Sequence, residues 1–404
     1  MKLSEELKWR GFINQSTLED VSLIDGEPIA FYWGVDPSAQ SMTIGNLASA
    51  MLVRHFIEHG HKATLLLGGA TGLIGDPDGK KDERNLKSQE EISSNKTAIS
   101  DEYKRIFSGK DFTVVDNYDW FKDMNYLSFL RDVGKHVPLS NMLGRDFVQA
   151  RLGEGGSGIS YAEFSYSLIQ GYDFLHLYRN AGVTLQLCGA DQWGNSIAGV
   201  DLIRRIEGGE AHILSTPLIV NKTTGVKFGK SEDGAVWLNP QMTSVYAFYQ
   251  FWLNVDDAGA IDYAKIYTLL SKEEIEALSK KQQEDPGARD VQKTLAREVT
   301  ALVHGSQSAE SAERVTAVLF GGMSFSELSD DDLNLLAHEI PTAQTGATAV
   351  DILANSGLAS SKGEARRLIL SGAISINGEK IFDDTTVDES VLIKKGKNSF
   401  LLVR

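Results

Sequence analysis

Short apolar runs, rich in β-branched or aromatic residues, alternate with helix-like patterns along the first half of the chain. The runs cover residues 29–35, 63–68, 112–115, 183–188 and 213–220. This alternation predicts a parallel sheet with helices on both faces, the α/β class. Several polar and glycine-rich segments begin where the runs end. Since ligands of open α/β sheets bind beyond the carboxyl ends of the strands, we expect these segments to share one crevice.

The pattern changes twice in the second half of the chain. From about residue 240 to 320, helical periodicity with Glu- and Lys-rich faces replaces the strand pattern, and we interpret the charge runs as solvated helix faces. A polar segment follows and predicts a helix-poor linker. The last residues predict two helices and a hairpin whose two-residue turn is Asn377-Gly378. We therefore expect four segments, with the bounds 1–231, 232–323, 324–348 (the linker) and 349–404.

Composition limits the partners and the compartment. The 404 residues carry a net charge of −15, which opposes nonspecific binding of nucleic acid over the whole surface, so any RNA contact must be local. Residues 341–404 differ, with eight Lys or Arg and seven Asp or Glu. No apolar run is long enough to cross a bilayer and the first residues lack an apolar signal core, so we expect a cytoplasmic protein without membrane contact. The single cysteine, Cys188, excludes an intramolecular disulfide and a Cys-based zinc site, and its apolar neighbours indicate a buried, inert thiol.

One helix-like segment, residues 163–178, carries a polar stripe. Tyr166, Gln170 and Asp173 stand at positions i, i+4 and i+7, which places a phenol, an amide and a carboxylate on one face. Apolar residues hold the other face, whereas a surface helix would usually carry Lys and Glu opposite its core side. The stripe predicts a pocket wall. The alternative is a set of polar contacts with neighbouring loops.

Three other features bear on chemistry. The loop at 227–231, Lys-Phe-Gly-Lys-Ser, suits a polyphosphate, because glycine allows close backbone approach and the lysines and serine supply charge and a donor; a solvated surface turn is the alternative. The glycine-rich segment 68–77 has the wrong spacing for both the dinucleotide fingerprint and the P-loop. His55 and His59 are one helical turn apart and His61 follows, but no convergent further ligand is evident, so we predict no metal site built by the protein.

Three segments, in their order along the chain, resemble the bacterial tyrosyl-tRNA synthetases. They are residues 32–39 running into Thr43-Ile44-Gly45-Asn46, then Asp191-Gln192-Trp193-Gly194-Asn195, and then the Lys-Phe-Gly-Lys-Ser loop, which matches the KMSKS loop of that family. The resemblance covers nearly the whole chain. It implies an α/β, Rossmann-like parallel-sheet catalytic domain, followed by a helical tRNA anticodon-side domain and a small α+β RNA-binding module like that of a small-ribosomal-subunit protein.

The same resemblance implies an activity and its partners. A tyrosine–tRNA ligase forms tyrosyl-adenylate and pyrophosphate from L-tyrosine and ATP, with Mg²⁺ bound to the ATP. It then transfers the tyrosyl group to the 3′-terminal ribose of tRNA-Tyr. A homodimer is implied as well.

Site residues carry over from the family position by position. The positions that match the tyrosine site are Tyr32, Asp76, Tyr166, Gln170, Asp173, Gln186 and Gln192. Within this set, Tyr32 and Asp173 would hold the phenolic hydroxyl of the substrate. The positions that match the ATP site are Asp36, Ser38, Gly45, Asn46, Lys80, Arg84, Asp191 and Lys230. The catalytic positions are Lys227, Lys230, Ser231, Thr43 and Asn46. In the last module Lys362, Arg366 and Arg367 would face RNA phosphates, assisted by Lys394, Lys395 and Lys397, with a solvated basic face as the alternative.

The chain departs from the family at residues 43–46. Family members usually have histidines at both ends of an H-I-G-H signature, and here Thr43 and Asn46 replace them. Asn46 can still donate to a ribose or phosphate oxygen and Thr43 keeps a hydroxyl, but neither side chain carries a positive charge. We therefore expect ATP to bind with weaker stabilisation of charge on the leaving pyrophosphate. The amino terminus of the helix predicted after Gly45 partly offsets this loss.

Three alternatives stay open at this point. Tryptophanyl-tRNA synthetases share the catalytic fold, but an indole has no phenolic oxygen for Tyr32 and Asp173 to hold. A catalytically silent, synthetase-like RNA-binding protein is suggested by the changed signature and opposed by the intact lysine loop. A dehydrogenase is disfavoured because no glycine fingerprint fits.

Overall fold

The computed structural model describes residues 1–77, 86–144, 146–153, 155–228, 230–231 and 234–404. Lys80 and Arg84 lie outside the described residues, and of Lys230 and Ser231 only the backbone is described. The chain forms two compact units, the first from Met1–Thr243 with Trp252–Leu295 and the second from Ser244–Phe251 with Ala296–Arg404. Among the described residues, no helix is both long and apolar enough to cross a membrane.

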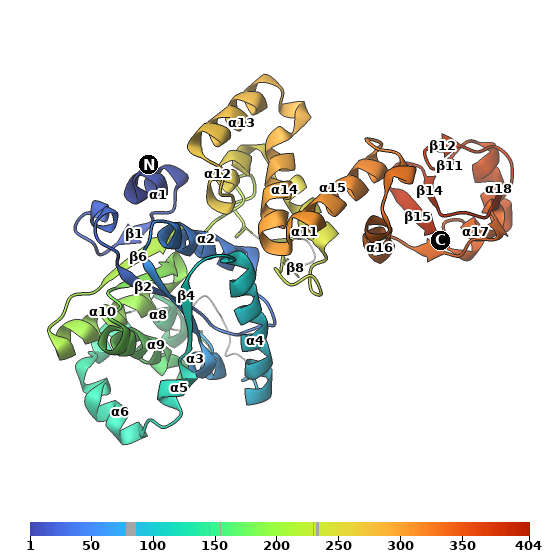
Figure 1. The fold of residues 1–404 in the computed structure, drawn as a ribbon. Coiled ribbons are helices and arrows are strands. Elements are labelled where there is room, and N and C mark those ends of the chain that lie inside the picture. Colours follow the sequence, from blue (N-terminus) through green and yellow to red (C-terminus); the bar gives the residue numbers. More distant parts are fainter. Residues whose placement is uncertain (78–85, 145, 154, 229, 232–233) are drawn as a thin grey trace. The chain divides into compact units, whose positions relative to one another are not determined.

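A six-stranded sheet organises the first unit (Figure 1). Its strand order is β1-β6-β5-β2-β3-β4. The four pairings among β2 to β6 are all parallel, and the edge strand β1 (Gln15–Ser16) runs antiparallel to β6. The other strands are β2 (Ala30–Val35), β3 (Lys62–Leu67), β4 (Phe112–Asp116), β5 (Leu185–Gly189) and β6 (His212–Thr216). Each overlaps a predicted run, although β6 ends four residues before the run predicted at 213–220, so the α/β parallel-sheet prediction is confirmed.

Helices cover both faces of this sheet because successive strand side chains point to opposite sides. On one side the Phe31 ring lies 5.3 Å from the Phe56 ring of α2 (Ile44–Glu58). On the other side the Tyr32 ring lies 5.2 Å from the Phe174 ring of α9 (Tyr161–Ala181). Parallel strands buried on both faces need continuous apolar runs, which is the signal the sequence carries.

The two helices that border the crevice have well-defined ends. Ser160 caps α9, because its Oγ accepts a hydrogen bond from the Glu163 backbone N–H at 3.3 Å, so the helix begins before the predicted residue 163. Helix α2 ends at Glu58, and Gly60 follows with φ +88°, a left-handed conformation that glycine adopts at low cost. Both helices therefore occupy the places expected from the sequence.

The remaining elements before residue 236 connect these layers. They are α1 (Leu3–Arg10), α3 (Gly69–Ile74), α4 (Gln89–Ile106), α5 (Tyr118–Phe121), α6 (Tyr126–Asp132), α7 (Leu139–Leu143), α8 (Asp146–Leu152), α10 (Trp193–Glu207) and the two-stranded ladder β7 (Lys230–Ser231) with β8 (Gly234–Ala235).

Helices fill the segment predicted to be helical, but the two compact units divide it. These helices are α11 (Val245–Leu253), α12 (Asp257–Tyr267), α13 (Lys272–Glu284), α14 (Asp290–His304) and α15 (Ser306–Phe320). Helices α12 and α13 belong to the first unit. Arg10 of α1 ties them there, since its guanidinium donates to the carbonyl oxygens of Lys265 (2.9 Å) and Leu270 (2.7 Å).

The segment predicted as a helix-poor linker instead contains α16 (Asp330–Glu339). The polar residues that suggested a linker have structural partners. Asp332 is fully buried and accepts hydrogen bonds from Arg314 Nε at 2.8 Å and Nη2 at 2.9 Å. Ser329 caps the helix, with its Oγ 3.3 Å from the Asp332 backbone nitrogen. Capping and a buried bidentate ion pair therefore stabilise a helix that composition alone did not predict.

The last module has the predicted two helices and hairpin, α17 (Ala349–Asn355), α18 (Lys362–Leu370) and β11 (Ile374–Ile376) with β12 (Glu379–Lys380). The turn residues Asn377 and Gly378 have φ values of 50° and 89°, as a two-residue hairpin turn requires. The sheet continues in the order β12-β11-β14-β15-β9, with β14 (Val391–Lys395), β15 (Ser399–Val403) and β9 (Thr342–Ala343). A further pair joins β10 (Ala347–Thr348) to β13 (Thr386–Val387). Strand β9 comes from the supposed linker, so the module starts earlier in the chain than predicted.

Candidate active site

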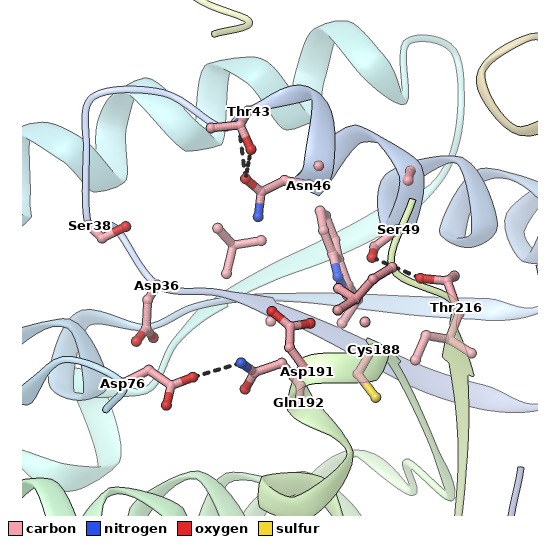
Figure 2. A pocket seen from close by; sticks show the side chains of 18 of the residues that line it. Asp36, Ser38, Thr43, Asn46, Ser49, Asp76, Cys188, Asp191, Gln192 and Thr216 are labelled. Atoms are coloured by element: carbon pink, nitrogen blue, oxygen red, sulfur yellow. Dashed lines mark hydrogen bonds between the residues drawn. The ribbon is translucent and has the colours of Figure 1, made fainter. Parts of the chain in front are cut away.

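A cavity of about 850 Å³ lies at the carboxyl ends of β2 and β5, beside the amino terminus of α2. Every predicted tyrosine, ATP or catalytic residue whose side chain is described lines it: Tyr32, Asp36, Ser38, Thr43, Gly45, Asn46, Asp76, Tyr166, Gln170, Asp173, Gln186, Asp191, Gln192 and Lys227. Figure 2 shows several of them, among them Asp36, Asp76 and Asp191. The predicted shared crevice is therefore present. Its volume falls in the range of pockets that enclose small molecules.

Three residues that line the cavity have a buried side-chain oxygen without a hydrogen-bond partner in the described part of the chain. These oxygens are Tyr32 Oη, Gln170 Oε1 and Gln186 Oε1. The Tyr32 side chain is 2% exposed and packs on Phe174. Burial is also the main reason that the pKa of Tyr32 lies well above its usual value, so the phenol stays neutral and can donate.

Asp173 is fully buried beside these atoms and is held by two residues that sequence analysis missed. Asn117 Nδ2 donates to its Oδ2 at 3.1 Å, and Trp120 Nε1 donates to its Oδ1 at 2.9 Å. Burial raises the pKa of Asp173 to about 8, although both hydrogen bonds favour the ionised form. Asn117 also fixes the glycine-rich segment, because its Oδ1 accepts from the Ala70 backbone N–H at 2.6 Å. A lone Asn at the turn after β4 and a lone Trp in the short helix α5 have no spacing pattern that could have identified them.

The next layer of the cavity is a network of carboxylates and donors. Asp36 accepts hydrogen bonds from Tyr166 Oη and from Thr71 Oγ1, each at 2.6 Å. Asp76 accepts from Gln192 Nε2 at 2.6 Å (Figure 2). Two acidic groups thus lie beside a phenol, a hydroxyl and an amide, and their carboxylate oxygens are acceptors that suit an ammonium group of a ligand.

Thr43 and Asn46 contact each other at the start of α2. Asn46 Oδ1 accepts two hydrogen bonds from Thr43, one from the backbone N–H and one from Oγ1, both at 2.9 Å. Because the backbone N–H can only donate, it fixes the orientation of the amide, and Nδ2 points into the cavity (Figure 2). The neutral pair therefore presents a donor where the family signature has a histidine.

The lysine-rich loop contains Phe228, whose ring packs among aromatic side chains. Phe228 is 7% exposed, and its ring stacks on Tyr263 with centroids 4.2 Å apart and an interplanar angle of 22°. The rings of Trp252 and Tyr267 lie 5.7 Å and 5.9 Å from it. Lys227, immediately before Phe228, lines the cavity. The contact fixes where the loop begins and places the first lysine at the cavity.

The predicted RNA-binding residues lie on helix α18 of the second unit. Arg366 and Arg367 are exposed, and Lys362 Nζ lies 2.7 Å from Asp351 Oδ1. Two of the assisting lysines also have partners within the unit. Lys395 Nζ donates to the Leu358 carbonyl at 2.5 Å, and Lys394 Nζ lies 5.1 Å from the centre of the Phe400 ring. Both side chains are partly exposed, and their role in RNA binding stays a prediction.

Cys188 and the histidines have unremarkable surroundings. The Cys188 thiol is buried in the cavity wall, and burial raises its pKa to about 12, which confirms the inert thiol. His55 Nδ1 and His59 Nε2 lie 3.5 Å and 3.8 Å from the carboxylate oxygens of Glu6 on α1. Within the described residues, no group of three His, Cys, Asp or Glu side chains could share a metal ion.

Family models match two parts of the chain. One, described as tRNA synthetases class I (W and Y), matches residues 25–321. The other, described as the tyrosine–tRNA ligase SYY-like C-terminal domain, matches residues 332–403. The second match begins inside α16 and includes β9, in agreement with a module that starts before residue 349.

Individual relatives agree with these matches. Proteins named tyrosine–tRNA ligase from Bacteroides thetaiotaomicron and Limosilactobacillus fermentum are 42% and 41% identical to the chain, with 100% of this chain and 99% of each relative covered. A C-terminally truncated mitochondrial tyrosyl-tRNA synthetase from Aspergillus nidulans has a similar solved structure, with a TM-score of 0.71 and 29% identity over 79% of this chain and 94% of that one. A tryptophanyl-tRNA synthetase from Encephalitozoon cuniculi, at 13% identity and a TM-score of 0.55, shares the fold alone. The chain therefore belongs to the class I tRNA synthetases and, within them, to the bacterial tyrosyl-tRNA synthetase family.

Proposed function

We propose that this chain is a tyrosine–tRNA ligase that forms tyrosyl-adenylate from L-tyrosine and ATP and then transfers the tyrosyl group to tRNA-Tyr. The observation that carries the proposal is the set of buried oxygens around one cavity, Tyr32 Oη, Gln170 Oε1 and Gln186 Oε1. Buried polar atoms in native proteins are nearly always paired. Three such atoms around one cavity therefore support a polar ligand there, and the phenols of Tyr32 and Tyr166 in its lining suit an amino acid with a polar ring.

Tyr32 and Asp173 would hold the phenolic hydroxyl of tyrosine. Tyr32 supplies a neutral O–H, and the Asp173 carboxyl is held by Asn117 and Trp120 so that it stays beside the slot. Phenylalanine would leave the Tyr32 hydroxyl buried and unpaired and would offer no hydroxyl to Asp173, which costs free energy that tyrosine does not lose. At the other end of the amino acid, Asp76, with Tyr166 and Gln170 nearby, would hold the ammonium group.

The ATP end of the cavity is lined by a different set of groups. Asp36, Ser38, Gly45, Asn46 and Asp191 would contact the nucleotide and the adenylate. The tyrosine carboxylate is already ionised at neutral pH, so no general base is needed to make it a nucleophile. Alignment of that carboxylate with the α-phosphorus, together with charge stabilisation, would supply the rate acceleration.

Charge on the departing pyrophosphate would be stabilised at the lysine-rich loop. Lys227 is at the cavity, and Lys230 and Ser231 follow in the same loop. Mg²⁺ would enter with ATP as part of the nucleotide substrate. Asn46 Nδ2 would donate one neutral hydrogen bond, and the amino terminus of α2 adds a partial positive charge. Lys80 and Arg84, which lie outside the described residues, would also contact the pyrophosphate, as the family resemblance implies.

We assign the tRNA contacts to the segments after residue 231, with Arg366, Arg367 and Lys362 facing phosphates.

We also propose a homodimer. Large apolar side chains are exposed on and beside α6 to α9: Tyr126 (58%), Leu127 (72%), Leu139 (59%), Leu152 (52%) and Tyr161 (64%). A surface with this many exposed apolar residues is typical of a protein–protein interface. Sedimentation equilibrium should give twice the chain mass, and Leu127→Asp should weaken the association.

The experiment that tests the function is amino acid-dependent ATP–pyrophosphate exchange with all twenty amino acids, followed by charging of tRNA. Tyrosine alone should support exchange. Exchange with tryptophan would indicate the related specificity, and RNA binding without any exchange would indicate a silent synthetase-like protein. Either result would overturn the proposal.

A further inference from the structure

We propose that Glu102 is a positioning residue for adenylate formation, which acts by holding the segment before α2 against the segment after the lysine-rich loop. The inference rests on the proposed function, since it concerns the rate of that reaction. Glu102 lies on α4 and is not among the residues that line the cavity. Its effect must therefore pass through other residues.

The Glu102 carboxylate is buried, and both of its oxygens accept hydrogen bonds. Its side chain is 2% exposed; Oε1 accepts from Ser41 Oγ at 2.6 Å and Oε2 accepts from the Met42 backbone N–H at 2.8 Å. Burial raises the pKa of Glu102, while these hydrogen bonds oppose the shift. The guanidinium of Arg105 reaches only to 3.9 Å, and its side chain is 43% exposed. Burial of a carboxylate costs free energy unless hydrogen-bond donors satisfy its oxygens. For Glu102 these donors are Ser41 and Met42.

Ser41 connects that carboxylate to a distant part of the chain. While its hydroxyl proton goes to Glu102, its Oγ accepts from the backbone N–H groups of Leu238 at 3.1 Å and Asn239 at 3.0 Å. The Met42 carbonyl lies 2.7 Å from Ser41 Oγ, but an anionic carboxylate is the stronger acceptor for the one available proton. The Ser41 hydroxyl thus joins three backbone segments at one atom.

Backbone contacts extend this junction toward the cavity. The Leu238 N–H lies 3.0 Å from the Met42 carbonyl, and the Ile44 N–H donates to the Val236 carbonyl at 3.1 Å. Thr43 and Trp237 form an antiparallel bridge between these two hydrogen bonds. Residues 41–44 and 236–239 therefore run together as a short ladder, with Glu102 and Ser41 at one end of it.

The ladder lies between the two segments proposed to bind phosphate. Residue 236 directly follows β8, which pairs with β7, the strand that contains Lys230. Ile44 begins α2, and Gly45 and Asn46 line the cavity. Residues at the tyrosine end, on β5 and α9, make no hydrogen bond to Glu102 or Ser41 among the described contacts. Loss of the junction should therefore affect the phosphate end selectively.

The test is Glu102→Gln, which keeps the size of the side chain but replaces one of its two acceptor oxygens with an NH₂ group. Either Ser41 Oγ or the Met42 N–H then faces another donor. A hydrogen bond to a charged group contributes about 1.5–3 kcal/mol, so we expect the single-turnover rate of adenylate formation at saturating ATP to fall by about 10- to 100-fold. Tyrosine affinity should change less than about twofold. Ser41→Ala should reproduce the effect. Asp101→Asn, the same loss of charge on the exposed neighbour of Glu102, should leave both quantities unchanged.

A double-mutant cycle with Lys230→Ala separates positioning from a general loss of stability. If Glu102 acts through the placement of the lysine-rich loop, Glu102→Gln should cost much less in the Lys230→Ala background than in the parent. Additive losses, a parallel fall in tyrosine affinity, or an unchanged rate in both Glu102→Gln and Ser41→Ala would overturn the inference. These results require an active parent protein. Absence of tyrosine-dependent exchange in the parent would instead overturn the proposed function.

Discussion

Removal of the Tyr32 hydroxyl should have opposite effects on tyrosine binding and on stability. Tyr32→Phe deletes an oxygen that is buried, at a residue 2% exposed, and that has no hydrogen-bond partner in the described protein. In the complex this oxygen would share a neutral hydrogen bond with the substrate phenol. Such a bond contributes about 0.5–1.5 kcal/mol, so tyrosine affinity should fall by about 2- to 12-fold.

The same substitution should not destabilise the ligand-free protein. An unpaired buried polar group costs about 1–3 kcal/mol, and deletion of the hydroxyl removes that cost while it leaves only an oxygen-sized gap beside Phe174. The free energy of unfolding should therefore stay the same or rise by up to about 1 kcal/mol. Phenylalanine should gain relative to tyrosine, because one fewer buried group is left unpaired when phenylalanine binds.

Three measurements check this reasoning. Fluorescence titration gives tyrosine affinity, urea unfolding gives stability, and pyrophosphate exchange with tyrosine and phenylalanine gives the specificity ratio. Tyr172→Phe is the matched control, since Tyr172 is on the same helix as Asp173 but does not line the cavity. Unchanged affinity and an unchanged specificity ratio in Tyr32→Phe would refute the placement of the phenol. A loss of stability above about 1 kcal/mol would refute the claim that the hydroxyl is unpaired.

Three further outcomes are expected. Lys230→Ala should depress the adenylation rate far more than tyrosine affinity, and equal losses in stopped-flow rate and equilibrium binding would contradict its assignment to the pyrophosphate. Because burial raises the pKa of Asp173 to about 8 from an ordinary 3.8, the folded protein keeps a proton there that the unfolded chain releases. The stability of the ligand-free protein should thus fall as pH rises from about 4 to about 8, and Asp173→Asn should flatten the profile of unfolding midpoints across that window. Arg366→Ala with Arg367→Ala should weaken tRNA binding and leave pyrophosphate exchange unaffected. The slope of the logarithm of the binding constant against the logarithm of salt concentration should fall by about one per lost phosphate contact. Filter binding at several salt concentrations measures this slope, and no change would indicate a solvated basic face.

The local sequence pattern was sufficient to predict those features in which a residue's environment follows from its neighbours in sequence. The parallel strands could be predicted because burial on both faces demands an unbroken apolar run, and the stripe of Tyr166, Gln170 and Asp173 could be predicted because helix geometry places those positions on one face. The specific roles of the site residues came from family resemblance, not from the pattern.

Long-range partners could not be predicted in this way. On an amphipathic helix such as α4, Glu102 has the pattern of an ordinary solvated carboxylate. Its burial is tolerable because Ser41 and Met42, 61 and 60 positions away, donate hydrogen bonds to it. Asn117 and Trp120 are single residues at a turn, and their significance depends on Asp173, which lies more than fifty positions away. Asp332 suggested a polar linker for the same reason, because Arg314 neutralises it from another helix.

The helix that replaced the expected linker determines where the carboxyl-terminal part of the protein can be cut. Leu392 and Leu402 of the module's sheet are buried together with Leu336 of α16 and Leu319 of α15. A fragment that starts at residue 349 would expose those leucines to water and lose β9 from the edge of its sheet, so it would tend to aggregate. Domain grafts and expression fragments should therefore begin before Val315, and a chimaera joined at residue 349 would have an exposed apolar surface.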